Sequence, residues 1–408
     1  MGGRRRRRRD AICLHSRGGV RLHCDGRVHG DVCSGRNMAS RERATSAPGR
    51  QPAWRSQGIG RWILALLLVL STGVLVVALG PRVDTVLPQV ALPQVPQDPR
   101  ALQAWLDARE RATPGLRADN QARIVWADPL HPGRRACAMV YLHGFTASQG
   151  EGAPTHQRLA RSFGCNLYLP RLPGHGLVAA DALRGIDAAR LLEGAAEALA
   201  VAQVLGERVV VIGNSMGGAL AVQTVAAHPQ HVQALVLWSP LVRERNEQLQ
   251  PMLWPWGAQL LAWTRNAGDP VLRHAVDSPY WADATHLDGY RALAALTRGG
   301  MRPSTYARIH VPVFLGYYYH DAQHQDGTVS VAAMQAMFRQ LGTPAAARQA
   351  VDFADAGNHV LASPVRSKAV PAVFAATCQF LAGKGGLQQP AGAPDCAHGW
   401  NAAAVSVR

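Results

Sequence analysis

The chain has 408 residues, 48% of them apolar and 17% charged, which fits one large globular domain with appendages. The formal charge of +16 lies mostly at the amino terminus, because residues 1–61 hold fifteen arginines and only four acidic residues. The remaining chain has no basic stripe with interspersed aromatic residues, which argues against nucleic acid as a partner of the folded part.

Residues 1–61 are expected to form a basic, disordered leader. The arginine run could also contact anionic lipid or nucleic acid, and translation could begin at Met38. The cysteines and histidines of this stretch match no zinc-ligand spacing, so no metal site is expected there. They are Cys13, His15, His23, Cys24, His29 and Cys33.

An uncharged apolar segment covers residues 62–79, which is near the shortest length that crosses a bilayer as a helix. A cleaved signal peptide is the competing interpretation, because its apolar core is followed by small residues such as Ala78 and Gly80. Pro81 would then follow the cleavage site, where a rigid residue without an N–H suits a protease poorly. We therefore predict an uncleaved signal-anchor helix.

Arginines precede the apolar segment, whereas Arg82 is nearly alone after it, so the amino terminus should be cytoplasmic. The protein is thus expected to be a single-pass membrane protein with its large folded domain on the extracytoplasmic, periplasmic side. Residues 80–99 contain five prolines and should form an extended spacer that lifts the domain off the membrane.

An extracytoplasmic domain would meet an oxidising environment, in which disulfides persist. Cys378 and Cys396 are the predicted pair, because they flank a Gly- and Pro-rich tail that would otherwise fray. Cys137 and Cys165 fall at or near predicted core strands, where they are expected to be free thiols that pack as small hydrophobes.

From about residue 100, apolar runs alternate with amphipathic stretches, which predicts a mainly parallel sheet with helices on both faces. The folded domain should cover residues 100–385, and residues 386–408 should form a tail. Helices are expected at 188–204, 217–227 and 331–341. The predicted strands are 122–127, 136–142, 166–169, 208–212, 234–238, 311–316 and 348–353.

The most informative motif lies at 209–218, where a buried strand runs through G-x-S-x-G into a helix. The turn is so tight that side chains at Gly213 and Gly217 would collide, and it exposes the hydroxyl of Ser215. The helix that begins there directs its free N–H groups at developing negative charge. Ser215 is therefore the predicted nucleophile.

A second strand ends in His143-Gly144-Phe145, which predicts that a backbone N–H is placed beside the nucleophile. The N–H groups of Phe145 and Met216 should form the oxyanion hole, and only their backbone atoms would act. His143 is expected to be structural, because Gly144 must lie against the sheet.

The acid and the base should follow the nucleophile in that order. Asp321 and Asp326 both lie in the loop after strand 311–316, and we choose Asp326 because Asp-x-x-Val before a helix ties the loop to the core. His359 is the predicted general base, since no other histidine lies between the last strand and the carboxy-terminal helix.

These motifs resemble the α/β-hydrolase superfamily, in particular its lysophospholipase, monoacylglycerol lipase and carboxylesterase-like branch. The resemblance covers roughly residues 120–385 and includes Arg171 to Gly176, the Ser215 turn and Gly357 to His359. It implies an α/β-hydrolase fold with a mainly parallel central sheet and a small helical lid. The separation of ten positions between Gly316 and Asp326 exceeds the usual gap of the family, which leaves Asp321 as an alternative acid.

The expected chemistry is ester hydrolysis through an acyl-enzyme, with a small or lipid-like acyl substrate and no metal or organic cofactor. Residues 240–308 exceed one crossover connection and are rich in tryptophan and leucine, which predicts a lid over an apolar pocket. The alternatives are an aminopeptidase with Glu244 or Glu247 binding an amine, an acyltransferase, and a catalytically silent binding domain. The sequence does not define an oligomeric state.

Overall fold

The computed structural model describes residues 54–397 and Trp400, with side chains from Gly60 onward. The chain divides into two units, Met1–Ala65 and Leu66–Arg408, and the boundary falls inside one helix. Most of the predicted leader at 1–61, the cysteine and histidine cluster within it, and the last residues of the tail lie outside the described residues.

Helix α1 runs from Trp54 to Ala78. Within it and the following residue, Gly60–Leu79 has a mean hydropathy of 2.7, and none of this segment is buried. In the described part of the chain it is the single helix that is long and apolar enough to cross a membrane, by length and composition. It coincides with the apolar segment expected at 62–79.

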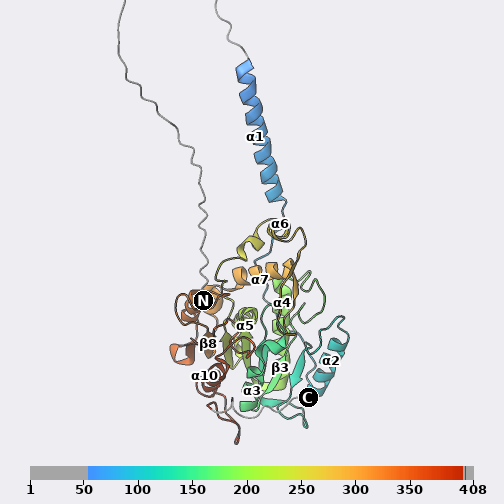
Figure 1. Cartoon of the computed structure of the whole chain (residues 1–408). Coiled ribbons are helices and arrows are strands. Elements are labelled where there is room, and N and C mark those ends of the chain that lie inside the picture. The colour runs from blue at the N-terminus through green and yellow to red at the C-terminus, as the bar shows by residue number, and fades with distance from the viewer. Residues whose placement is uncertain (1–53, 398–399, 401–408) are drawn as a thin grey trace, which may run out of the picture. The chain divides into compact units, whose positions relative to one another are not determined.

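The second unit is built on a seven-stranded sheet with the order β1-β3-β2-β4-β5-β8-β9. Only β1 is antiparallel to its neighbour, and every other pairing is parallel, as buried strands joined by crossover helices require. The α/β-hydrolase fold expected from the sequence is thus present (Figure 1). The strands are β1 Arg123–Val125, β2 Arg135–Leu142, β3 Asn166–Leu169, β4 Gly206–Asn214, β5 Ala234–Trp238, β8 Val313–Tyr317 and β9 Arg348–Asp352.

Helices cover both faces of this sheet. Alternate side chains of β4 divide between the two layers, with Val209 and Val211 in one core and Val210 and Ile212 in the other. Helices α3 and α10 lie side by side on the second face (Figure 1). The helices of the domain body are α2 Pro99–Arg111, η1 Gln149–Gly152, α3 Thr155–Ser162, α4 Ala188–Leu205, α5 Met216–Ala227, η2 Pro229–His231, α9 Val331–Arg339, η4 Ala345–Ala347 and α10 Val370–Ala382.

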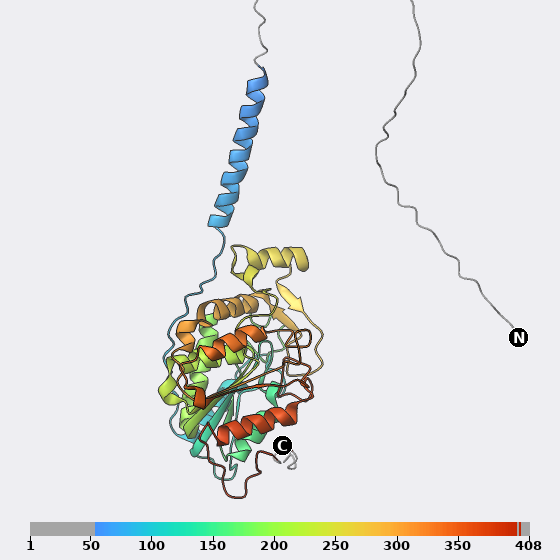
Figure 2. The same ribbon diagram turned by 90° about the vertical axis from the view of Figure 1, so that its left-hand side faces the viewer.

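The Pro-rich segment 80–99, which we call the linker, follows the surface of the domain, as Figure 2 shows. It does not extend away from the domain as a free spacer. Val95 is buried in the core, and the Val90 carbonyl oxygen lies 2.8 Å from Nε2 of His228. The expectation of a spacer is therefore wrong for most of this segment. The physical reason is that its apolar residues recur often enough to cover exposed core. They are Val83, Leu87, Val90, Leu92 and Val95.

The segment after β5, where a lid was predicted at 240–308, is not purely helical; we refer to it as the lid. Strands β6 Val271–Arg273 and β7 Ala284–His286 pair as a small antiparallel sheet that the sequence did not predict. Helix α6 packs on α7 through a cluster of its own, outside the main core (Figure 1). The helices of the lid are η3 Gln250–Leu253, α6 Gly257–Arg265, α7 Leu287–Gly300 and α8 Pro303–Tyr306.

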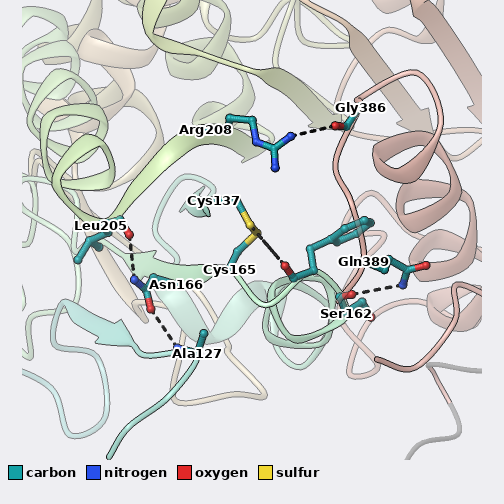
Figure 3. The surroundings of a disulfide bond; sticks show 10 residues. Ala127, Cys137, Ser162, Cys165, Asn166, Leu205, Arg208, Gly386 and Gln389 are labelled. Atoms are coloured by element: carbon teal, nitrogen blue, oxygen red, sulfur yellow. Dashed lines mark hydrogen bonds between the residues drawn. A yellow bond between two sulfur atoms is a disulfide. The ribbon is translucent and has the colours of Figure 1, made fainter. Parts of the chain in front are cut away.

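Two disulfide bonds cross-link segments of the domain. Cys378–Cys396 fixes the tail to α10, as predicted. Cys137–Cys165 corrects the expectation of two free thiols. Strands β2 and β3 are neighbours with Ala138 opposite Asn166, so the preceding cysteines lie side by side with 4.8 Å between their Cα atoms (Figure 3).

Candidate active site

The predicted nucleophile lies at the carboxyl end of β4, near the middle of the sheet. Ser215 has φ 51° and ψ −117°, outside the favoured regions for a residue with a side chain, and α5 begins at the next residue. Its carbonyl oxygen accepts the N–H of Leu241 at 2.8 Å, and its own N–H donates to Trp238 at 3.1 Å. Two backbone hydrogen bonds to the end of β5 and the residues just after it thus hold the strained turn.

Small residues around Ser215 are required by close backbone approach. A Cβ atom at Gly217 would lie 1.9 Å from the Leu142 carbonyl oxygen, and one at Gly213 would lie 2.5 Å from that of Gly217. Both distances are far below van der Waals contact, as the sequence motif predicted. Any side chain at either position would displace the turn.

The predicted acid and base are in direct contact. Nδ1 of His359 lies 2.6 Å from Oδ2 of Asp326, whose other oxygen accepts the N–H groups of Thr328 and Val329 at 2.8 Å each. Asp326 is fully buried, so this carboxylate is held in one orientation. Asp321 is instead on the surface, where it contacts His324.

The long gap before Asp326 is explained by a small excursion of the chain. Tyr319 pairs with Gln325, and the N–H of Asp326 donates to the Tyr318 carbonyl oxygen at 3.1 Å. The additional residues therefore fold back on themselves and return Asp326 to the end of β8.

Burial and charge act in opposite directions on this pair. Burial lowers the pKa of His359, but the charge and hydrogen bond of Asp326, with the charge of Glu151, raise it, and the net shift is upward. Burial raises the pKa of Asp326, but His359 and two N–H donors lower it, and the net shift is downward. An ionised Asp326 that stabilises a protonated His359 follows from both directions.

Ser215, Asp326 and His359 follow β4, β8 and β9, so all three lie at the same carboxyl edge of the parallel sheet. Nε2 of His359 is buried and has no hydrogen-bond partner among the described residues. This is the ring nitrogen that could accept a proton, because Nδ1 is occupied by Asp326.

The two predicted oxyanion donors are at the same edge. Met216 is the first residue of α5, and Phe145 follows the end of β2; neither N–H makes a hydrogen bond to another described residue. The Thr146 carbonyl oxygen accepts the N–H of Ala282 at 2.8 Å, which ties the Phe145 loop to the lid. Buried Trp281 lies in this contact, against Ala147 and Val360.

His143 has a structural environment, as expected. Its Nε2 accepts the N–H of Leu172 at 3.2 Å, and its ring packs edge-on against His175. Burial lowers the pKa of both histidines, that of His175 to about 4, so both are neutral at pH 7.

Glu151 lies near the site but was not predicted as a site residue from the sequence. Glu151 on η1 is 2% exposed, and its Oε2 accepts the Gly144 N–H at 2.7 Å and the Tyr141 hydroxyl at 2.8 Å. No periodicity or motif identifies a lone glutamate in a Gly-rich loop, because its role depends on contacts with a strand ten residues away.

A sheet of this order, with a serine at a strained strand-to-helix turn and an aspartate–histidine pair at the same edge, defines an α/β hydrolase. The model of the family described as "Serine aminopeptidase, S33" matches residues 133–343, more than half of the chain. The chain therefore belongs to this family of α/β hydrolases. The match ends before His359. A comparison with curated proteins finds no match.

Solved structures resemble the chain in fold. The structure titled "LipS and LipT, two metagenome-derived lipolytic enzymes" aligns with a TM-score of 0.52 and 16% identity, over 65% of this chain and 99% of that one. Two others have a TM-score of 0.46. The monoacylglycerol lipase of Paleococcus ferrophilus is 14% identical, over 64% of this chain and 98% of that one. A soluble variant of monoglyceride lipase from Saccharomyces cerevisiae is 13% identical, over 65% and 91%. At these identities the likeness establishes the fold alone.

Proposed function

We propose that the protein is a membrane-anchored serine esterase that cleaves carboxylic esters through an acyl-enzyme. The observation that carries the proposal is the contact of 2.6 Å between His359 and Asp326, at the sheet edge where Ser215 occupies the strained turn. A buried aspartate that fixes one ring nitrogen leaves the other to activate a hydroxyl.

In the proposed reaction, Ser215 Oγ attacks the ester carbonyl carbon while Nε2 of His359 takes the hydroxyl proton. The negative oxygen that develops is bound by the N–H groups of Phe145 and Met216. His359 then donates the proton to the leaving alcohol, and the acyl group remains on Ser215. Water deprotonated by His359 then attacks the acyl carbonyl carbon, the bond to Ser215 Oγ breaks, and His359 returns the proton to that oxygen as the acid is released. No metal or cofactor is needed.

A lipid-like substrate is supported by the surface of the lid. Trp254, Trp256, Leu260 and Trp263 are 40 to 74% exposed, and they lie on α6 and in the turn between η3 and α6. A cluster of exposed tryptophans is unusual on a soluble surface and suits the interface between water and lipid. The apolar span Gly60–Leu79 would keep the enzyme at a membrane.

The extracytoplasmic location is supported by the two disulfides, Cys137–Cys165 and Cys378–Cys396. Structural disulfides persist in oxidising compartments and are rare in the cytosol. The arginines before the apolar span agree with this orientation.

Aminopeptidase activity is the second candidate, because the family description names it and Glu244 offers a binding group for an amine. Glu244 is 9% exposed; its Oε1 accepts the Leu249 N–H at 3.0 Å, whereas its Oε2 has no partner among the described residues. A buried carboxylate oxygen of this kind would bind an ammonium group.

Hydrolysis of a substrate panel tests the proposal. We expect the full-length protein in detergent to cleave p-nitrophenyl esters, with a preference for medium or long acyl chains, and to leave aminoacyl p-nitroanilides intact. The reverse preference would replace the esterase proposal with the aminopeptidase one. Cleavage of neither class by folded protein would refute both.

The lid surface gives a separate prediction. Replacing Trp254 and Trp263 with serine should lower hydrolysis of emulsified long-chain esters about tenfold, because each interfacial tryptophan strengthens binding to lipid. Hydrolysis of soluble p-nitrophenyl acetate should change less than about twofold, since only partition to the interface is altered. The matched control replaces Leu130 and Val178, which are exposed and lie outside the lid, with serine. These substitutions should affect neither rate. Equal losses on both substrates would contradict an interfacial role.

A further inference from the structure

Glu151 is a buried carboxylate without an arginine or lysine partner. None of the ion pairs among the described residues involves it, although Glu110, the other well-buried glutamate of the body, pairs with Arg171 at 2.7 Å. An unpaired buried charge is costly, so either the carboxyl is neutral or another group compensates the charge. The groups around it therefore have to be identified.

Four elements supply those groups. Tyr141 on β2 donates its hydroxyl to Glu151, and Asn214 on β4 faces it without a hydrogen bond of normal length. The ring of His156 on α3 packs at a tilt against Tyr141, and burial lowers the pKa of His156 to about 4, so it carries no charge at neutral pH. His359, in the loop after β9, is the remaining titratable group. Burial raises the pKa of Glu151, whereas the Gly144 N–H, the Tyr141 hydroxyl and a positive charge on His359 lower it, and the net shift is upward. A proton on His359 therefore favours the ionised form of this carboxyl group.

The same carboxylate also holds the oxyanion loop. Gly144 donates its N–H to Glu151 at 2.7 Å, and a Cβ atom at Gly144 would lie 2.6 Å from the other carboxylate oxygen. Gly144 immediately precedes Phe145, whose N–H is the proposed oxyanion donor. The position of that N–H therefore depends on the bond between Gly144 and Glu151.

We propose that Glu151 is a positioning residue that fixes the oxyanion loop through Gly144 and places a second negative charge beside His359 when that imidazole is protonated. This inference rests on the proposed roles of Ser215 and His359. Asp326 faces Nδ1 of His359. The loop that carries His359 packs on the segment that carries Glu151, because Val360 lies against Ala147 and the Thr155 hydroxyl donates to the Ala362 carbonyl oxygen at 2.7 Å. A glutamine could accept both hydrogen bonds of Glu151, so only the charge distinguishes the two residues there.

Two substitutions separate the charge from the hydrogen bond. Glu151→Gln retains an acceptor for Gly144 and removes the charge, so the pKa of His359 should fall by roughly half to one unit. The acid limb of kcat/KM should move down in pH by the same amount, because His359 would then lose its proton more readily. We expect kcat to fall about tenfold with KM nearly unchanged, since the charge acts when His359 is protonated in the transition state.

Glu151→Asp retains the charge but withdraws the acceptor from Gly144. Its acid limb should stay near that of the wild type while kcat falls about tenfold, because the Phe145 N–H is no longer fixed. Exposed Glu193 on α4 provides the control for removal of one charge, and Glu193→Gln should match the wild type in both measurements.

The measurement is the ¹³C NMR titration of the His359 ring in full-length protein, assigned by its loss in His359→Asn, together with the pH profile of ester hydrolysis. The NMR titration does not require ester turnover, so it tests Glu151 even if the esterase proposal fails. Wild-type titration and pH profile in Glu151→Gln would overturn the proposal and leave Glu151 a structural residue. If that variant does not fold, a Glu151→Asp enzyme with wild-type kcat would overturn it instead.

Discussion

Replacement of Ser215 with alanine is expected to lower kcat/KM for p-nitrophenyl butyrate by roughly 10⁵-fold, because the nucleophile of the acyl-enzyme pathway is lost. The residual rate would come from the oxyanion hole and substrate binding. The backbone of the turn is held by Leu241 and Trp238, so the variant should fold. Labelling with a fluorophosphonate probe, followed by gel fluorescence, checks the result independently of substrate choice.

Ser239 is the matched control for this experiment. It follows the end of β5, the neighbouring strand, is fully buried, and its hydroxyl has no partner among the described residues. Ser239→Ala should therefore be labelled and active like the wild type. Labelling of the Ser215→Ala protein, or loss of labelling in both variants, would contradict Ser215 as the nucleophile.

The order of elements could be predicted because most strands are short apolar runs buried on both faces. The run at 234–238 and the observed β5 agree fully, and helix α5 begins one residue before the expected position. Strands β6 and β7 have only three residues each and contain no continuous apolar run, so nothing in the sequence indicated that they form a sheet.

The features that were predicted wrongly or not at all depend on contacts between segments that are apart in the sequence. The disulfide Cys137–Cys165 depends on β3 lying beside β2, an adjacency that strand patterns do not specify. The docking of the linker likewise depends on which core surface the helices leave uncovered. Glu151 was not predicted as a site residue, because the sequence does not show that its carboxylate accepts hydrogen bonds from Gly144 and Tyr141.

Asp326 could be preferred to Asp321 as the predicted acid because its local sequence has a physical consequence. In Asp-x-x-Val before a helix, the carboxylate can accept the backbone N–H three residues later, and Asp326 Oδ1 does accept that of Val329 at 2.8 Å. Asp321 makes a similar local turn with Gln323 and His324, but on the surface. The local turn sequence thus favoured Asp326 among the two candidate acids, and the two differ in that Asp326 is buried and Asp321 is on the surface.

Substitution of these two aspartates gives the second large effect. Asp326→Asn should lower kcat/KM by roughly 10³- to 10⁴-fold, because an amide can no longer hold the His359 tautomer or stabilise its charge. The pKa of His359, which Asp326 raises, should fall, so the acid limb of the residual activity should move to lower pH. Steady-state kinetics between pH 5 and 9 would measure both changes.

Asp321→Asn removes the same charge five residues away, in the same loop. Asp321 has its pKa lowered to about 2 by hydrogen bonds from His324 and Gln323, yet it does not contact His359. We expect its kcat/KM to remain within about twofold of the wild type, since exposed charges act weakly through water. A large loss in Asp321→Asn with little loss in Asp326→Asn would show that the loop rearranges in the working enzyme. The acid role would then belong to Asp321, because a buried carboxylate whose removal leaves the rate unchanged cannot be stabilising the imidazolium of His359.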